Sequence, residues 1–193
     1  MSDLVIDASV AVKWVIEEEG TKEALALRGL ALTAPDLLIA ECVNILWKKV
    51  RRSELSEREA AFAGGLLARA DIDLVAMRPY LETAVRIALA LDHPAYDCVY
   101  IALAEAEGLR FVTADTSLVR KVGLQASGRY ADRVPGLADA ARWQEQAGGF
   151  GPPPRSSGSG GCRSPVCRGG VSPLYERCGY CQHSNKVICN SHI

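Results

Sequence analysis

The segment Leu-Val-Ile-Asp-Ala-Ser-Val at residues 4–10 decides the fold class of this chain. Its first three residues are apolar and predict a short buried strand, whereas the apolar positions after Asp7 predict a helix over residues 8–18. The carboxylate of Asp7 lies between two apolar stretches, where burial of a charge is costly unless the charge is paired or binds a cation. The segment therefore predicts an α/β unit with a polar site where its strand ends.

Further helix and strand patterns alternate through the first 150 residues. Helices are predicted over residues 22–32, 35–52, 57–69, 79–91, 96–107, 115–122 and 137–146, and strands over residues 72–77, 110–113 and 128–134. Ser56 and Glu59 form a capping box, and Gly108 occupies the position that glycine favours beyond a helix end. Strands alternating with helices predict a mostly parallel sheet flanked by helices, with ligands beyond the carboxyl ends of its strands.

Three more acidic residues lie in or beside segments that should be buried, namely Glu41, Asp97 and Asp115. Each has an ordinary explanation: an exposed helix position for Glu41, complementation of a helix dipole for Asp97, and a helix cap for Asp115. Four acids beside the core of one small domain nevertheless favour a common site. Carboxylates are ligands of hard cations, and the first 150 residues hold a single histidine, so we expect Mg²⁺ or Mn²⁺ and not catalytic zinc.

The order of these motifs resembles the PIN-domain nucleases, and within them the VapC-like toxins of bacterial type II toxin–antitoxin pairs. The resemblance rests on VIDASV, AECVN, YDCVYIALAE and FVTAD, and it covers residues 3–140. It implies a three-layer PIN-like domain over residues 1–147 and a metal-dependent ribonuclease activity. It assigns Asp7 and Asp97 to the primary Mg²⁺ ion, Glu41 and Asp115 to a shared or second ion, and Ser9, Asn44 and Thr113 to a supporting polar shell. It also implies a homodimer and a cognate antitoxin protein that silences the enzyme.

The charge of the chain gives little help in choosing a partner, because the formal net charge is only −1. Residues 1–150 hold 17 Lys and Arg against 22 Asp and Glu. An RNA substrate would then depend on local basic groups, for which the candidates are Lys48, Lys49, Arg51, Arg52, Lys13 and Lys121. The same run at a helix end could equally complement the helix dipole.

The last 46 residues differ in composition from the rest. Residues 148–161 are rich in Gly, Pro and Ser and predict a flexible linker. Residues 162–193 contain five of the seven cysteines, including Cys178 and Cys181 in a CxxC spacing, so a small zinc module is one reading. Because this Cys-rich tail has few apolar residues, we expect disorder instead.

Two other functions remain open at this point. A non-catalytic scaffold that binds RNA or an antitoxin would use the basic helix end, and a carboxylate and Mg²⁺ phosphatase would also place an Asp after its first strand. The haloacid dehalogenase type of phosphatase requires a second Asp two residues later, where this chain has Ser9. With no signal peptide and no long apolar span, we expect a cytoplasmic protein that does not enter a membrane.

Overall fold

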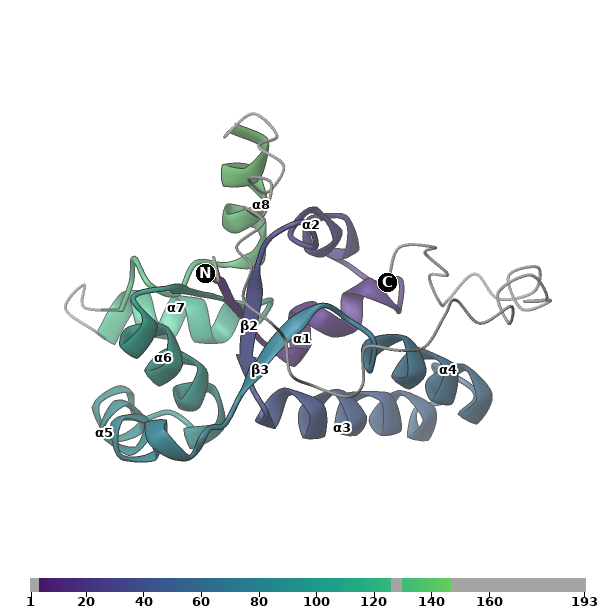
Figure 1. Cartoon of the computed structure of the whole chain (residues 1–193), viewed down its shortest axis with the longest axis horizontal. Helices are drawn as coiled ribbons and strands as arrows, with labels where there is room; N and C mark the ends of the chain where they lie inside the picture. Colours follow the sequence, from purple (N-terminus) through teal and green to yellow (C-terminus); the bar gives the residue numbers. More distant parts are fainter. Residues whose placement is uncertain (1–3, 126–129, 147–193) are drawn as a thin grey trace, which may run out of the picture.

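The computed structural model describes residues 4–125 and 130–146, and within them one all-parallel sheet forms the centre of the molecule (Figure 1). Its strands are β1 (Leu4–Ile6), β2 (Leu32–Pro35), β3 (Ile72–Val75) and β4 (Arg110–Val112), in the order β3-β2-β1-β4. Strand β1 pairs with β2 on one side and with β4 on the other. Asp7, which follows β1, therefore lies at the carboxyl end of a strand that has a neighbour on both sides.

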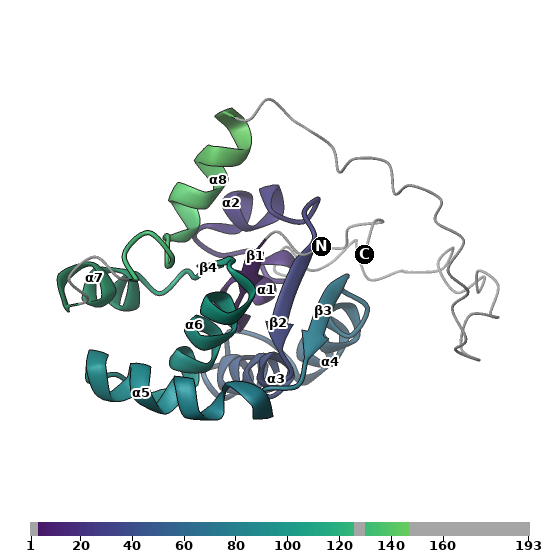
Figure 2. The ribbon, with the colours of Figure 1, turned by 60° about the vertical axis from the view of Figure 1, so that its left-hand side comes forward.

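Helices cover both sides of this sheet. They are α1 (Ala8–Ala11), α2 (Thr21–Ala26), α3 (Leu37–Arg51), α4 (Glu57–Leu67), α5 (Leu81–Leu91), α6 (Ala95–Glu107), α7 (Thr116–Gln125) and α8 (Leu137–Gln146), with 3₁₀ turns η1 (Val12–Trp14) and η2 (Arg78–Tyr80). Helix α6 packs across β1, β2 and β4, and α5 packs on α6. Helices α1, α3 and α4 lie on the opposite side (Figures 1 and 2). This confirms the predicted three-layer α/β fold.

Two local predictions hold in atomic detail. Ser56 Oγ accepts the backbone N–H of Glu59 while the Glu59 carboxylate accepts the backbone N–H of Ser56, so the capping box opens α4 as expected. Helix α6 ends at Gly108, whose φ of 69° lies in the left-handed region that glycine adopts without strain.

Strand β2 was missed in the sequence, and the predicted helix over residues 22–32 is too long. Helix α2 stops at Ala26, and all four residues of β2 are buried between β1 and β3. A four-residue segment is too short to be told from a helix by its periodicity, and Pro35 resembled a helix start although it ends the strand.

Two other boundaries also differ from the prediction. The helix expected over residues 8–18 ends early, because α1 gives way to η1 and the chain turns away after Trp14, whose indole N–H donates to the carbonyl of Ala24. The strand expected over residues 128–134 is wrong where the structure describes it, since residues 130–134 form a turn. This turn still borders β4, because the N–H of Phe111 donates to the carbonyl of Arg133.

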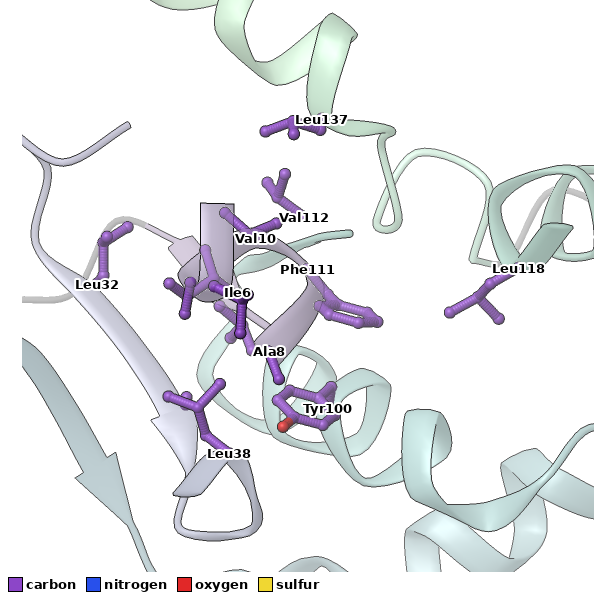
Figure 3. Close-up of a cluster of buried hydrophobic side chains, with 14 of the residues drawn as sticks. Ile6, Ala8, Val10, Leu32, Leu38, Tyr100, Phe111, Val112, Leu118 and Leu137 are labelled. Atoms are coloured by element: carbon purple, nitrogen blue, oxygen red, sulfur yellow. The ribbon is translucent and has the colours of Figure 1, made fainter. Parts of the chain in front are cut away.

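The core lies between the sheet and α6 and continues under α1 (Figure 3). Tyr100 of α6 and Phe111 of β4 are both fully buried, and their rings stack with centroids 5.3 Å apart. Ile6 and Ala8 lie beside this pair (Figure 3). The stack fixes α6 against the end of the sheet where Asp7 is found.

In the described ranges no single helix has the length and hydrophobicity to cross a membrane, and only the sharply bent pair 78–91 and 95–107 passes that test when its two helices are combined. The predictions for the linker at residues 148–161 and for the tail at residues 162–193 fall outside the described residues.

Candidate active site

Asp7 is the centre of a hydrogen-bond network at the end of β1. Its Oδ1 accepts the hydroxyl of Ser9 at 2.6 Å and the backbone N–H of Val10 at 3.1 Å, and its Oδ2 accepts the hydroxyl of Thr113 at 2.6 Å. The bond to Val10 makes Asp7 the cap of α1. Three donors therefore hold a carboxylate that is only 6% exposed.

Thr113 joins this network to Asp115, at the start of α7. The Thr113 hydroxyl accepts the backbone N–H of Asp115 at 3.0 Å, while the Ser9 hydroxyl accepts the N–H of Ala114 at 2.9 Å. The carboxylate of Asp115 itself accepts the N–H groups of Ser117 and Leu118, so the helix-cap reading of this residue is correct. Asp115 lies at the margin of the site, with its side chain bonded to its own helix.

Burial raises the pKa of Asp7 from 3.8 to about 6, despite three hydrogen bonds that act in the opposite direction. The charge of Asp97 raises it further. A cation that approaches a buried carboxylate stabilises its charged form, because the cation compensates for the lost hydration.

Glu41 of α3 is the second acid of this group. Its Oε2 accepts the hydroxyl of Tyr100 from α6 at 2.5 Å. Burial raises the pKa of Glu41, the bond from Tyr100 lowers it, and the charges of Asp7 and Asp97 raise it. Glu41 thus lies within electrostatic range of both aspartates, although it is separated from them along the chain.

Asp97, in the first turn of α6, is the third acid. Its Oδ2 lies 2.7 Å from Nε2 of His93, four residues earlier across Pro94. Its charge acts on Asp7, on Glu41 and on the neighbouring thiol of Cys98. The charge of Asp97 therefore reaches both Asp7 and Glu41, while the common metal site of these acids stays a prediction.

The donor chemistry of this group fits a hard cation. Burial, followed by nearby acids, raises the pKa of the Cys42 thiol to about 12 and that of Cys98 to about 11, so both sulfurs stay protonated and neutral. Carboxylate and hydroxyl oxygens remain, and these suit Mg²⁺ and Mn²⁺. In the part of the chain that the structure describes, no three His, Cys, Asp or Glu side chains stand close enough to hold an ion as they are. Tyr100 donates to Glu41 and His93 lies against Asp97, so each of these two acids already has one protein partner.

Other predicted residues are placed less centrally. Asn44 is exposed on α3, and no hydrogen bond between described residues links it to the acids. Lys49 forms salt bridges with Glu18 at 2.9 Å and Glu54 at 3.1 Å, and Lys13 forms one with Glu18 at 2.8 Å. Through Glu18, Lys49 connects the end of α3 to the segment that follows η1.

Lys121 donates to the carbonyl of Asp92, and Arg52 lies 3.9 Å from Glu54. Lys48 and Arg51 are exposed at the end of α3, outside every salt bridge found among the described residues. The role of these two residues in contacting RNA stays a prediction.

Sequence reasoning missed Tyr100 and His93, each of which bonds to one predicted acid. The signal for Tyr100 was a tyrosine within an apolar helix, because a buried phenol requires a partner for its hydroxyl. The signal for His93 was its spacing of four residues from Asp97.

A family model described as the PIN domain matches residues 4–124, a span that contains all four predicted acids. This chain belongs to the PIN domain family. The match covers β1 to α7, so the PIN domain accounts for the whole sheet and for every residue of the Asp7 network.

Two curated relatives match this PIN domain over nearly their full length. Ribonuclease VapC3 of Pyrobaculum aerophilum is 34% identical over 125 residues, which are 61% of this chain and 93% of that protein. Ribonuclease VapC12 of Mycobacterium tuberculosis is 27% identical over 124 residues, 64% of this chain and 95% of that protein. The crystal structure of PAE2754 from Pyrobaculum aerophilum matches 75% of this chain and 90% of its own, with 20% identity and a TM-score of 0.54, and supports the fold.

Proposed function

We propose that this PIN domain is an endoribonuclease that hydrolyses RNA phosphodiester bonds with Mg²⁺ or Mn²⁺, and that it is the toxin of a toxin–antitoxin pair. The observation that carries the proposal is the buried Asp7 carboxylate, held by Ser9 and Thr113 within electrostatic range of Glu41 and Asp97. The names of the two curated relatives, both ribonucleases VapC, support RNA as the substrate.

The residues that would hold the ion are Asp7, Glu41 and Asp97, with Asp115 at the margin. When bound, such a cation neutralises the phosphate and activates the attacking water. Ser9 and Thr113 fix the orientation of the Asp7 carboxylate, so this ligand loses little rotational freedom when an ion binds. Burial and, to a smaller extent, the charges of neighbouring acids raise the pKa of Asp7 and of Glu41, and a bound cation would offset both effects.

The direct test is RNA cleavage by protein that has been treated with a chelator, before and after addition of Mg²⁺ or Mn²⁺. We expect no cleavage without metal and full rescue by either ion. Asp97→Asn should reduce cleavage at least about 100-fold, because several kcal/mol of charge stabilisation depend on the ion. The matched control is Asp73→Asn on β3, an exposed aspartate outside the site, which should cleave normally.

Calorimetric titration of the same proteins with Mn²⁺ measures ion binding independently of cleavage. We expect binding by the unchanged protein and by Asp73→Asn, and weaker binding by Asp97→Asn. Cleavage that persists after complete chelation would contradict the metal mechanism. RNA binding without cleavage in either metal would favour the scaffold, and hydrolysis of p-nitrophenyl phosphate without RNA cleavage would favour the phosphatase.

We also propose that the active form is a homodimer. Helices α3 and α5 each present an apolar stripe at spacings of four residues, and both helices lie at the lower edge of the molecule in Figures 1 and 2, although they cover different faces of the sheet. The stripes comprise Ile39, Val43 and Trp47 on α3 and Leu81, Val85 and Leu89 on α5, all exposed. Trp47 and Leu89 are 58% and 78% exposed, and large exposed apolar side chains in a row along a helix favour association with a partner protein.

The antitoxin is proposed to enter a groove of about 700 Å³ beside the site. Thr113, which contacts Asp7, lines this groove together with Arg120 of α7 and Leu137 of α8. Co-expression with the product of the adjacent reading frame should inhibit cleavage. Ala138→Trp, which fills the groove from an exposed position on α8, should weaken that inhibition while leaving the hydrogen bonds of Asp7 intact.

A further inference from the structure

Tyr100 is the largest fully buried side chain in the described residues, and its surroundings leave it little freedom. It belongs to α6, the helix that packs across three of the strands. Its ring stacks on Phe111 at a centroid distance of 5.3 Å and an interplanar angle of 16°. A tyrosine has only two side-chain torsions, and here the packing fixes both, so the hydroxyl is held at one point in space.

The hydroxyl of Tyr100 meets one specific oxygen of Glu41. It donates to Oε2 at 2.5 Å, and no hydrogen bond among the described residues reaches Oε1. Glu41 is a flexible side chain on a different helix, 59 residues earlier in the sequence. An unrestrained Glu loses rotamer entropy when a ligand fixes it. The bond from Tyr100 restricts Glu41 in advance and leaves its second oxygen available to a ligand.

Tyr100 also lies within the field of Asp7. Burial raises the pKa of the Tyr100 phenol, and the charges of Glu41 and Asp7 raise it further. The phenol therefore stays protonated near neutral pH and acts as a donor. In Figure 3 the hydroxyl lies at the end of the ring that faces Leu38, near the start of α3, which is the helix that carries Glu41.

We propose that Tyr100 is a positioning residue of the metal site: its hydroxyl holds Glu41 near Asp7 so that Oε1 of Glu41 can bind the divalent cation. This proposal rests on the proposed function, because it concerns the same ion. It assigns to Tyr100 a role that acts through Glu41, without contact between Tyr100 and substrate or ion.

The test is Tyr100→Phe, which keeps the ring and the stack on Phe111 and removes only the donor. The matched control is Tyr80→Phe, because the Tyr80 hydroxyl also donates to a glutamate, Glu107 at 3.3 Å, away from the acids. Calorimetric titration of the chelated proteins with Mn²⁺ should show affinity lowered about 10-fold in Tyr100→Phe, as expected for a residue that orients a ligand, and unchanged in Tyr80→Phe. In cleavage assays, the Mn²⁺ concentration for half-maximal rate should rise, with kcat largely restored at saturating Mn²⁺.

A second experiment separates a role through Glu41 from a general effect on the fold. Tyr100→Phe is combined with Glu41→Gln, and Mn²⁺ affinity is compared across the four proteins. We expect Tyr100→Phe to have no further effect once Glu41→Gln is present. Thermal unfolding in chelator confirms that each variant is folded.

Distinct outcomes refute the two proposals. If Glu41→Gln weakens Mn²⁺ binding while Tyr100→Phe binds as the unchanged protein does, Tyr100 has no positioning role and the metal mechanism stands. The positioning role is also refuted if Tyr100→Phe weakens binding equally with and without Glu41→Gln, because its effect is then independent of Glu41. If the unchanged protein binds no Mn²⁺, the proposed function itself fails, and the role of Tyr100 fails with it.

Discussion

Replacement of Asp7 by Asn measures how far burial of the Asp7 carboxylate lowers the free energy of unfolding. The pKa of Asp7 in the folded protein is about 6, against an ordinary value of 3.8. Between these two pH values the folded chain retains a proton that the unfolded chain has released. The contribution of Asp7 to stability is therefore fully present below about pH 4 and is lost as the pH rises to about 6 and beyond.

The size of this loss follows from the shift. The difference between a pKa of about 6 and the ordinary value of 3.8, at about 1.36 kcal/mol per pKa unit, amounts to about 3 kcal/mol. Roughly 2 kcal/mol of it falls between pH 4 and pH 7.5, because the unfolded carboxyl is already partly ionised at pH 4. Asp7→Asn has no such loss, so its stability relative to the unchanged protein should rise by roughly 2 kcal/mol over this interval.

Urea unfolding in the presence of a chelator, at pH 4 and at pH 7.5, measures the effect. With a slope of about 2 kcal/mol per molar urea, the difference between the two proteins in midpoint should change by roughly 1 M. The amide introduced by Asp7→Asn forms weaker hydrogen bonds with Ser9 and Thr113 than the carboxylate does. This difference lowers the urea midpoint of the variant equally at both pH values, so it cancels in the comparison. Asp73→Asn serves as the control and should follow the unchanged protein.

A constant difference between Asp7→Asn and the unchanged protein at the two pH values would refute the reasoning. It would mean that Asp7 titrates alike in the folded and unfolded chains, so that no burial cost exists for a cation to relieve. Mg²⁺ or Mn²⁺ at about 100 times its dissociation constant should add about 2.7 kcal/mol of stability to the unchanged protein at pH 7.5 and much less to Asp7→Asn.

Three further outcomes are expected. Truncation after Gly149 should leave a folded nuclease with unchanged RNA cleavage, since the described residues contain the core and every predicted ligand; loss of cleavage or of the unfolding transition would show that the boundary is misplaced. Leu89→Lys should convert the proposed dimer to a monomer in analytical ultracentrifugation, because it places a charge in the apolar stripe of α5, and a protein that sediments unchanged would exclude this face from the proposed interface. Ser56→Ala should lower the free energy of unfolding by about 1 kcal/mol through loss of the α4 cap, measured by urea unfolding, with cleavage unaffected.

The elements that the sequence predicted well are those with strong local signals. The capping box predicted the start of α4, and Gly108 predicted the end of α6. Both boundaries lie where these signals placed them. Strand β2 carried no such signal. Its four residues are buried because β1 and β3 pair with them on either side. This is a tertiary contact, and the local sequence does not indicate it.

The same contrast applies to the site. Asp7 could be found because a carboxylate between apolar residues is anomalous in the sequence itself. The bond from Tyr100 to Glu41 depends on two helices meeting, and no spacing within either helix indicates it. Asn44, on the same helix as Glu41, is exposed, and its supporting role at the site stays a prediction.

The Asp7 network also has a consequence for the time at which the site forms during synthesis. The two residues joined by the Thr113 to Asp7 bond are 106 positions apart, and β1 acquires its second neighbour only when β4 exists. At ~5–20 residues per second, the ribosome needs roughly 5 to 20 s to add the intervening chain. Throughout that interval the nascent chain carries Asp7 without its Thr113 donor. Assembly of the site therefore comes late in translation of the domain, and partial chains released earlier lack the completed network.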